Sequence, residues 1–180
     1  LVYFEAVGAA FPLVIAGLGL IASIHGTFFV RGDEKSNPHK ALKTGSYAAS
    51  VLVLIASFVL SRMFFGNFNA AIAIAAGLTV GILIGIITEV YTSGDYNSVK
   101  EIATQSETGA ATTTISGIAV GMRSTAAPIL LICVGIFAAY NFCGLYGIAL
   151  AAVGMLSTTA ITVAVDAYGP IADNAGGIAE

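Results

Sequence analysis

Residues 166–180 read DAYGPIADNAGGIAE and follow directly on an uncharged run that is long enough to cross a lipid bilayer. Three carboxylates in this stretch, Asp166, Asp173 and Glu180, are spaced seven residues apart. Because an α-helix has about 3.6 residues per turn, positions seven apart drift by only about 20° and stay on one face. The stretch therefore predicts a helix with an acidic stripe.

Small residues surround this stripe, so neighbouring helices can approach it closely; they are Gly169, Ala172, Ala175, Gly176 and Gly177. Carboxylates that lie close together repel one another unless a cation is bound among them. Carboxylate oxygens suit Mg²⁺, which proteins usually hold through one or two carboxylates together with phosphate oxygens of a substrate. The pattern indicates a site for Mg²⁺ and a phosphate compound.

Composition places the chain among membrane proteins. Of its 180 residues, 57% are hydrophobic and only 9% are charged, whereas roughly 25% of residues are charged in soluble domains. The seven Lys and Arg residues are scattered and the net charge is −3. Nucleic-acid binding depends on clustered positive charge, so we expect no nucleic-acid partner and a protein that lies in the lipid bilayer.

The apolar runs predict an all-α fold, a polytopic bundle of transmembrane helices forming a single membrane domain over residues 1–180. The five expected spans cover about 6–30, 45–65, 70–88, 119–139 and 145–165, and residues 166–180 extend the last one. Residues 124–165 hold 42 uncharged residues. As one helix they would be about 63 Å long, twice the thickness of the hydrocarbon core, so we expect the chain to fold back at 140–144.

The short loops predict the orientation. The loop at 31–45 carries four basic residues, and the turns at 66–69 and 140–144 carry none. Positively charged loops favour the cytoplasm, and counting crossings from there puts residues 89–107 on the same side. The same count puts residues 166–180 on the cytoplasmic side. Arg62, at the opposite end, does not fit this rule.

The second polar segment, 89–107, predicts a surface helix. Ser98 is a suitable N-cap and Glu101 would complete a capping box with it. The five acidic residues expected to converge at this end of the bundle are Glu89, Asp95, Asp166, Asp173 and Glu180.

The 166–180 segment closely resembles the signature helix of the membrane-integral pyrophosphatases, ion pumps driven by hydrolysis of inorganic pyrophosphate. Three further segments look like family segments: 145–157, Glu89-Val-Tyr-Thr-Ser93 and Thr108-Gly-Ala-Ala-Thr112. The resemblance covers at least residues 89–180. Residues 1–88 match the family in hydropathy more than in motif.

The resemblance implies an ion-translocating inorganic pyrophosphatase with about sixteen spans per subunit, acting as a homodimer in the membrane with its active site facing the cytoplasm. Its substrate would be Mg²⁺-pyrophosphate, the transported ion H⁺ or Na⁺, and K⁺ a further candidate cofactor. The chain is then expected to be an internal fragment that is inactive by itself.

The matching motif also implies residue roles. Asp173 corresponds to a Mg²⁺ ligand of the substrate complex, and Asp166 to an acidic residue of the same pocket that acts through metal or water. These two are the expected catalytic and metal-binding residues, and Asn174 the expected substrate-binding residue. Glu180, Glu89 and Arg123 are further candidates, for each of which capping, ion pairing or packing is an alternative role.

Two functions from different classes remain open at this point. One is the ion-translocating hydrolase; the other is a secondary cation transporter whose acidic helix binds the transported ion itself. A carrier usually holds its ion near the middle of the membrane, on interrupted helices. The five expected spans contain no Asp or Glu at mid-depth, which favours the hydrolase, as does the resemblance.

Overall fold

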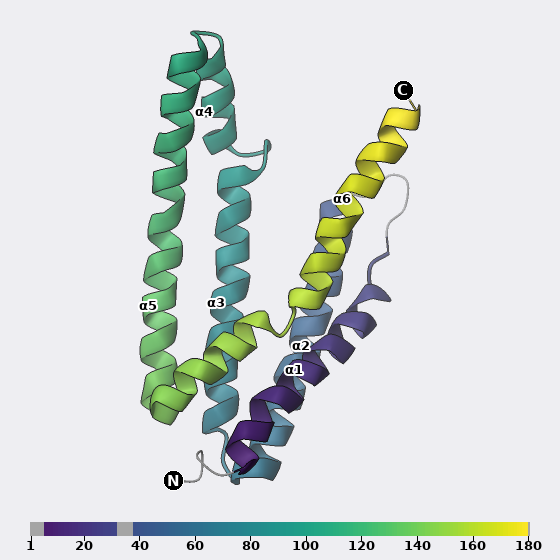
Figure 1. Cartoon of the computed structure of the whole chain (residues 1–180), viewed down its shortest axis with the longest axis vertical. Helices are drawn as coiled ribbons and strands as arrows, with labels where there is room; N and C mark the ends of the chain where they lie inside the picture. Colours follow the sequence, from purple (N-terminus) through teal and green to yellow (C-terminus); the bar gives the residue numbers. More distant parts are fainter. Residues whose placement is uncertain (1–5, 32–37, 180) are drawn as a thin grey trace.

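The computed structural model describes residues 6–31 and 38–179, and every regular element in them is a helix. There are six: α1 (Ala6–Thr27), α2 (Pro38–Phe65), α3 (Asn69–Thr92), α4 (Asn97–Ser106), α5 (Ala110–Leu156) and α6 (Thr159–Ala179). In Figure 1, α3, α4 and the long upper part of α5 form one side of the molecule, and α1, α2 and α6 form the other. The expected all-α helix bundle is confirmed.

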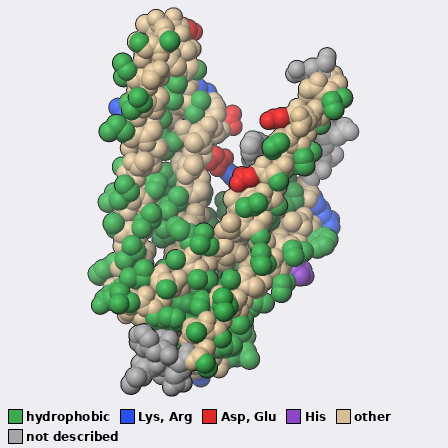
Figure 2. Space-filling view, in the orientation of Figure 1, with side chains coloured by type: hydrophobic (Ala, Val, Ile, Leu, Met, Phe, Trp, Pro, Cys, Tyr) green, Lys and Arg blue, Asp and Glu red, His purple; other side chains and the backbone are tan. Residues whose placement is uncertain are grey.

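Four stretches of the described residues are long and apolar enough to span a membrane: Ala6–Thr27, Ala41–Phe65, Asn69–Ser106 and Ala110–Ala179. The expectation of five separate spans differs from this, because the fourth and fifth expected spans lie in one 70-residue helical stretch. Large apolar side chains such as Leu13, Met63 and Ile129 are exposed on the outer surface, and Figure 2 shows such side chains over most of the lower part of the molecule. This is the distribution expected where lipid replaces water as the solvent.

The 70-residue stretch reverses direction at Gly144, inside the 140–144 segment where the sequence predicts a turn. Gly144 has φ 60° and ψ −145°, a backbone conformation that residues with a Cβ rarely adopt. Residues 110–143 run along α3, and residues 145–156, here called the crossing arm, leave at an angle towards α6 (Figure 1). Fold reversal therefore depends on the one residue type that tolerates this conformation.

A second break interrupts the expected fifth span. The helix ends at Leu156, and α6 begins at Thr159 with a new direction. The expectation of one continuous helix over 145–165 is therefore wrong. The hydroxyl of Ser157 donates to the carbonyl of Gly154 at 2.6 Å, so a local side-chain bond replaces a helical one at this point, a competition that serine residues often provide.

The crossing arm packs directly on α3. A Cβ added to Gly77 would overlap the carbonyl oxygen of Ala151, and one added to Gly154 would overlap the carbonyl oxygen of Ile74. Each helix thus places a glycine against the backbone of the other, which allows the close approach that small residues provide in membrane helices. The apolar core lies beside this crossing and includes Phe11, Ile15, Ile74, Leu150 and Ala151.

The corner between α2 and α3 has its own polar clamp. Ser61 is fully buried; its hydroxyl donates to the carbonyl of Asn67 at 2.8 Å and accepts from the amide of Ala71 at 3.3 Å. Arg62 donates to the carbonyl of Gly66 and lies 6.0 Å from the centre of the Phe68 ring. Arg62 therefore caps the C-terminal end of α2. This local role explains why a basic residue lies on the side of the membrane where the positive-inside rule predicts none.

Helix α4 forms in the polar segment as expected, but its predicted cap is wrong. The helix begins at Asn97 with Tyr96 as its N-cap, and no side chain bonds to the cap. Ser98 and Glu101 lie inside the helix. An extended Tyr96, at φ −101° and ψ 155°, starts the helix two residues earlier than the capping box requires.

We expect Gly77→Ala to lower the free energy of unfolding of the full-length protein by about 1–3 kcal/mol, because an overpacked contact must open. Thermal unfolding in detergent measures this. Gly85→Ala is the matched control, since no atom of the described residues lies within 4 Å of its added Cβ. Alanine favours helices over glycine by up to about 1 kcal/mol, so this control should be neutral or stabilising, and equal losses in both variants would contradict the crossing.

Candidate functional site

The site is built around α6, which carries the acidic stripe. Asp166 and Asp173 are both exposed and lie in one uninterrupted helix, which continues through Pro170. Seven residues of α-helix rise by about 10 Å, so these two carboxylates stand at different heights along one face. They are the described acidic residues of α6, and Figure 2 shows acidic side chains of this helix on the side that faces α3 and α4.

A cavity of about 410 Å³ lies below the acidic stripe, between α2, α3 and α6. Thr159 and Thr162 form its α6 wall, and Thr158 of the break lies next to them. Thr159 precedes Asp166 by seven residues and Thr162 precedes it by four, so all three share a helix face. The acidic stripe therefore continues, towards the end of α6, the same face whose hydroxyl groups line the cavity.

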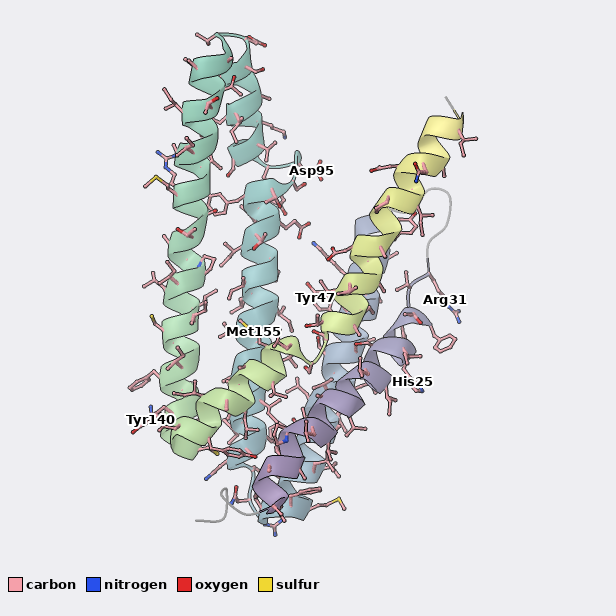
Figure 3. The ribbon with its side chains drawn as sticks, viewed as in Figure 1. His25, Arg31, Tyr47, Asp95, Tyr140 and Met155 are labelled. Carbon is pink, nitrogen blue, oxygen red and sulfur yellow. The ribbon has the colours of Figure 1, made fainter. Side chains whose placement is uncertain are left out.

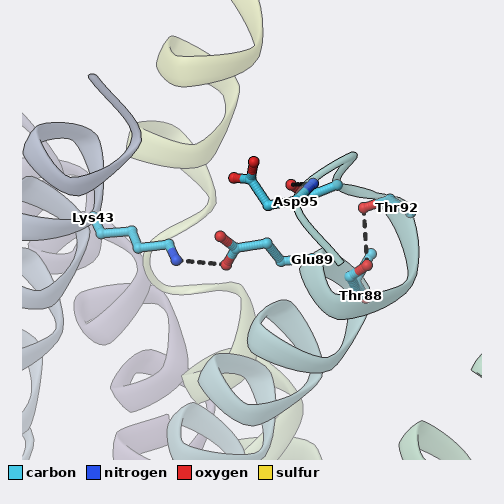
Figure 4. A network of polar contacts seen from close by, with 6 residues as sticks. Lys43, Thr88, Glu89, Thr92 and Asp95 are labelled. Carbon is cyan, nitrogen blue, oxygen red and sulfur yellow. Dashed lines mark hydrogen bonds and ion pairs between the residues drawn. The ribbon is translucent and has the colours of Figure 1, made fainter. Parts of the chain in front are cut away.

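Glu89 lies across the cavity from α6, in the last turn of α3. Its carboxylate makes an ion pair with Lys43 of α2, with 2.5 Å between Oε2 and Nζ, and both residues line the cavity. Figure 4 shows Lys43 reaching from α2 to Glu89, with Asp95 in the α3–α4 connection beyond it. Of the roles proposed for Glu89, the structure shows ion pairing.

Lys43 is the site residue that the sequence analysis missed. It counted only as one of the four basic residues in the 31–45 loop, which set the orientation. The signal available was its place next to a long apolar run, where a lysine stem packs along helices and its charge stays at the polar boundary. Which of the ten carboxylates it meets depends on how α2 and α3 pair, and loop charge does not specify that.

Asp95 is exposed and lies next to Glu89 in the close-up view (Figure 4). Its backbone is fixed locally, because its amide donates to the hydroxyl of Ser93 at 3.3 Å. Lys100 donates to the carbonyl oxygen of Asp95 at 2.8 Å. The carboxylate thus stays available while its backbone is held on both sides.

The remaining predicted residues lie in different places. Asn174 is exposed on α6 next to Asp173, and Glu180 lies outside the described residues. Arg123 is exposed on α5 and borders a separate cavity of about 270 Å³, whose other polar walls include Glu101 and Gln105 of α4. The structure therefore brings Glu89 and Asp95 to the end of the bundle that holds the α6 acids, and places Arg123 against α4.

Within residues 6–31 and 38–179, no three Asp, Glu, His or Cys side chains lie close enough together to hold one metal ion. The two α6 carboxylates are too far apart along the axis to bind the same ion directly. Each is free of other protein partners among the described residues, so each offers both oxygens. That donor set fits a water-rich ion such as Mg²⁺, for which one or two carboxylates and phosphate oxygens suffice.

Comparison with known proteins identifies the relatives of this chain. The family described as inorganic H⁺ pyrophosphatase matches residues 2–180. The chain belongs to this family. The match covers the α6 acids, the Lys43–Glu89 pair and the crossing arm. Membership of the inorganic H⁺ pyrophosphatase family therefore extends to the N-terminal half, where the sequence analysis found similar hydropathy but no motif.

Individual relatives agree with this assignment. The chain is 54% identical to a Clostridium tetani protein provisionally named a K⁺-stimulated pyrophosphate-energized sodium pump, with 99% of the chain covered. It is 45% identical to K⁺-insensitive pyrophosphate-energized proton pump 2 of Moorella thermoacetica, with 99% covered. It is 42% identical to a K⁺-insensitive proton pump of Methanosarcina mazei, with 94% covered.

The chain corresponds to 28% of the length of the first two relatives and 26% of the third. Family membership and the long apolar helices together make it part of a multi-pass membrane protein. Names of the relatives include both sodium and proton pumps, and both K⁺-stimulated and K⁺-insensitive ones. Identity over this region therefore does not sort the pumps by ion.

We expect Lys43→Glu to destabilise the full-length protein, since it places two carboxylates side by side, and the swap Lys43→Glu with Glu89→Lys to restore most of the loss. The two side chains are 42% and 30% exposed, so solvent screening limits the coupling free energy to about 0–1 kcal/mol. Thermal unfolding of the single and double variants measures it. Lys100→Glu is the control for reversing a charge outside this ion pair. If the double variant loses as much stability as the two single variants together, Lys43 and Glu89 do not stabilise each other.

Proposed function

We propose that the full-length protein containing this chain hydrolyses Mg²⁺-pyrophosphate at a cytoplasmic site and couples hydrolysis to transport of H⁺ or Na⁺ across the membrane. The observation that carries the proposal is the exposed, aligned pair Asp166 and Asp173 on α6. It stands in a chain whose relatives are named pyrophosphate-energized pumps.

In this proposal Asp173 is a ligand of the Mg²⁺ that accompanies pyrophosphate, and Asp166 belongs to the same pocket. Magnesium neutralises charge that develops on the phosphoryl oxygens. A rise of about 10 Å between the carboxylates suits two points of contact along one metal-bound substrate. Asn174 offers an amide donor to a phosphate oxygen, Glu89 holds Lys43 beside the cavity, and Glu180 is a further candidate that lies outside the described residues.

The cytoplasmic orientation rests on the charge of the 31–45 loop. The arrangement supports it, because α3 and α6 both run upward to their last residues while the α2–α3 corner and the bend within α5 lie at the lower end (Figure 1). Pyrophosphate would then meet the α6 acids from the cytoplasm. The proposed homodimeric assembly of the full-length protein rests on the family resemblance alone.

The family assignment argues against the alternative, a secondary transporter whose acidic helix binds the transported cation. The position of the acids does too. Asp166 and Asp173 lie in the last two-thirds of α6, exposed at the end of the bundle, and not in the core around Ile74 and Leu150. K⁺ remains a candidate cofactor, because relatives of both kinds are equally covered by this chain.

We expect Asp173→Asn in the full-length protein to abolish Mg²⁺-dependent hydrolysis of pyrophosphate, by a factor of about 100 or more, since the amide replaces an anionic ligand. Asp166→Asn should act in the same direction. Release of phosphate from purified protein in lipid vesicles is the measurement, with insertion checked by the yield of folded protein.

Glu107→Gln is the matched control, because Glu107 is an exposed carboxylate at the end of α4, away from α6. It should leave hydrolysis unchanged. Normal turnover of pyrophosphate by Asp173→Asn would show that Asp173 is not part of the site. Uptake of Na⁺ or H⁺ by the unaltered protein without pyrophosphate would favour the transporter.

A further inference from the structure

The break between α5 and α6 leaves backbone groups without helical partners. At the start of any helix the first N–H groups lack intrahelical acceptors, here those of Thr159, Ala160 and Ile161. In hydrocarbon no solvent is present to pair with them, and irregular backbone at this depth persists where protein or water covers it. The break therefore needs hydrogen-bonding partners that lipid does not supply.

Ser23 of α1 lies at the level of this break. A Cβ added to Gly19 would overlap the carbonyl oxygen of Ser157, and one added to Gly26 would lie 3.0 Å from Cδ1 of Ile161. Ser23 is one turn beyond Gly19 on the same buried face of α1. It therefore lies between the contact of Gly19 with Ser157 at the break and the contact of Gly26 with Gly45 of α2 and Ile161 of α6.

The hydroxyl of Ser23 has no partner. The residue is 2% exposed, and its Oγ is a buried polar atom without a hydrogen bond among the described residues. The other buried serines do bond: Ser57 donates to Leu54 at 2.8 Å and Ser157 to Gly154 at 2.6 Å. A buried hydroxyl left unpaired loses its hydrogen bonds to water without replacement, so such a group points to a ligand.

Space for water lies next to the start of α6. Thr159, the first residue of α6, borders the 410 Å³ cavity beneath the acidic stripe and also a second cavity of about 610 Å³, whose walls include Ala16 and Leu20 of α1. One water occupies about 30 Å³ in the liquid, so the first cavity, whose walls carry threonine and serine hydroxyls, has room for several. In Figure 3, Met155 and Tyr47, which both line the first cavity, lie near the junction of the crossing arm with α6.

We propose that the α5–α6 break is a buried water site: water molecules bind the free N–H groups at the start of α6 and the hydroxyl of Ser23. The polar mouth of the first cavity, at Lys43 and Glu89, is their route from the surface. Water inserted in this way replaces helical hydrogen bonds and makes the break a hinge. Helix α6 then changes its tilt without exposing unpaired backbone, and its acidic stripe moves with it.

Hydrogen–deuterium exchange on the full-length protein in lipid nanodiscs tests the site directly. The amides of Thr159, Ala160 and Ile161 should exchange about 100-fold faster than those of Ala73 to Val80 in α3, which are hydrogen-bonded within a continuous helix at similar depth. Rates for the first turn of α6 as slow as those of α3 would overturn the proposal.

Ser23→Ala provides an independent test that does not depend on exchange. If Ser23 holds a water molecule, the variant loses a hydrogen bond and its thermal midpoint should fall by at least about 2 °C. If the hydroxyl is unpaired, its removal relieves a cost, and a midpoint that is unchanged or higher would refute the site. Ser57→Ala is the matched control, equally buried but bonded within its own helix, and should change the midpoint less.

Discussion

The close crossing of α3 by the arm of residues 145–156 is the contact on which the rest of the structure depends. Gly77 and Gly154 place the two backbones against each other at this crossing, and an apolar core from α1, α3 and α5 forms around it. Since lipid tails are as apolar as the side chains, packing of this kind rather than exclusion of water holds membrane helices together. The crossing directs the chain away from residues 110–143 of α5 and towards α1 and α2, where α6 begins.

The position of the polar groups follows from that direction. Helix α6 returns to the end of the bundle where α3 finishes, so its carboxylates lie beyond the cavity that Glu89 lines, and Figure 2 shows acidic side chains on both sides of the gap there. Lys43 pairs with Glu89 and reduces the negative charge at the rim. Charged groups are costly in hydrocarbon, and collecting the described carboxylates at one end leaves the apolar middle of the molecule to the lipid.

The sequence predicted the all-α bundle, the reversal at 140–144 and the surface helix, because long uncharged runs and a glycine in a polar turn are local signals. The acidic stripe followed from the seven-residue spacing of Asp166 and Asp173. The break at Ser157–Thr158 was not predictable, since nothing in an uncharged run marks where packing against α1 bends a helix. The Lys43–Glu89 pair depends on which helices are neighbours, and capping of α4 by Tyr96 replaced a motif that fitted the sequence equally well.

The account requires the end of α6 and the start of α4 to lie on the same side of the membrane, opposite the α2–α3 corner. Single cysteines at Asn174, Asn97 and Phe68, in a background with Cys133 and Cys143 replaced, test this with a membrane-impermeant thiol reagent on vesicles of known orientation. We predict that Asn174→Cys and Asn97→Cys react from the cytoplasmic side and Phe68→Cys from the other. Labelling of Asn174→Cys and Asn97→Cys from opposite sides would contradict the arrangement.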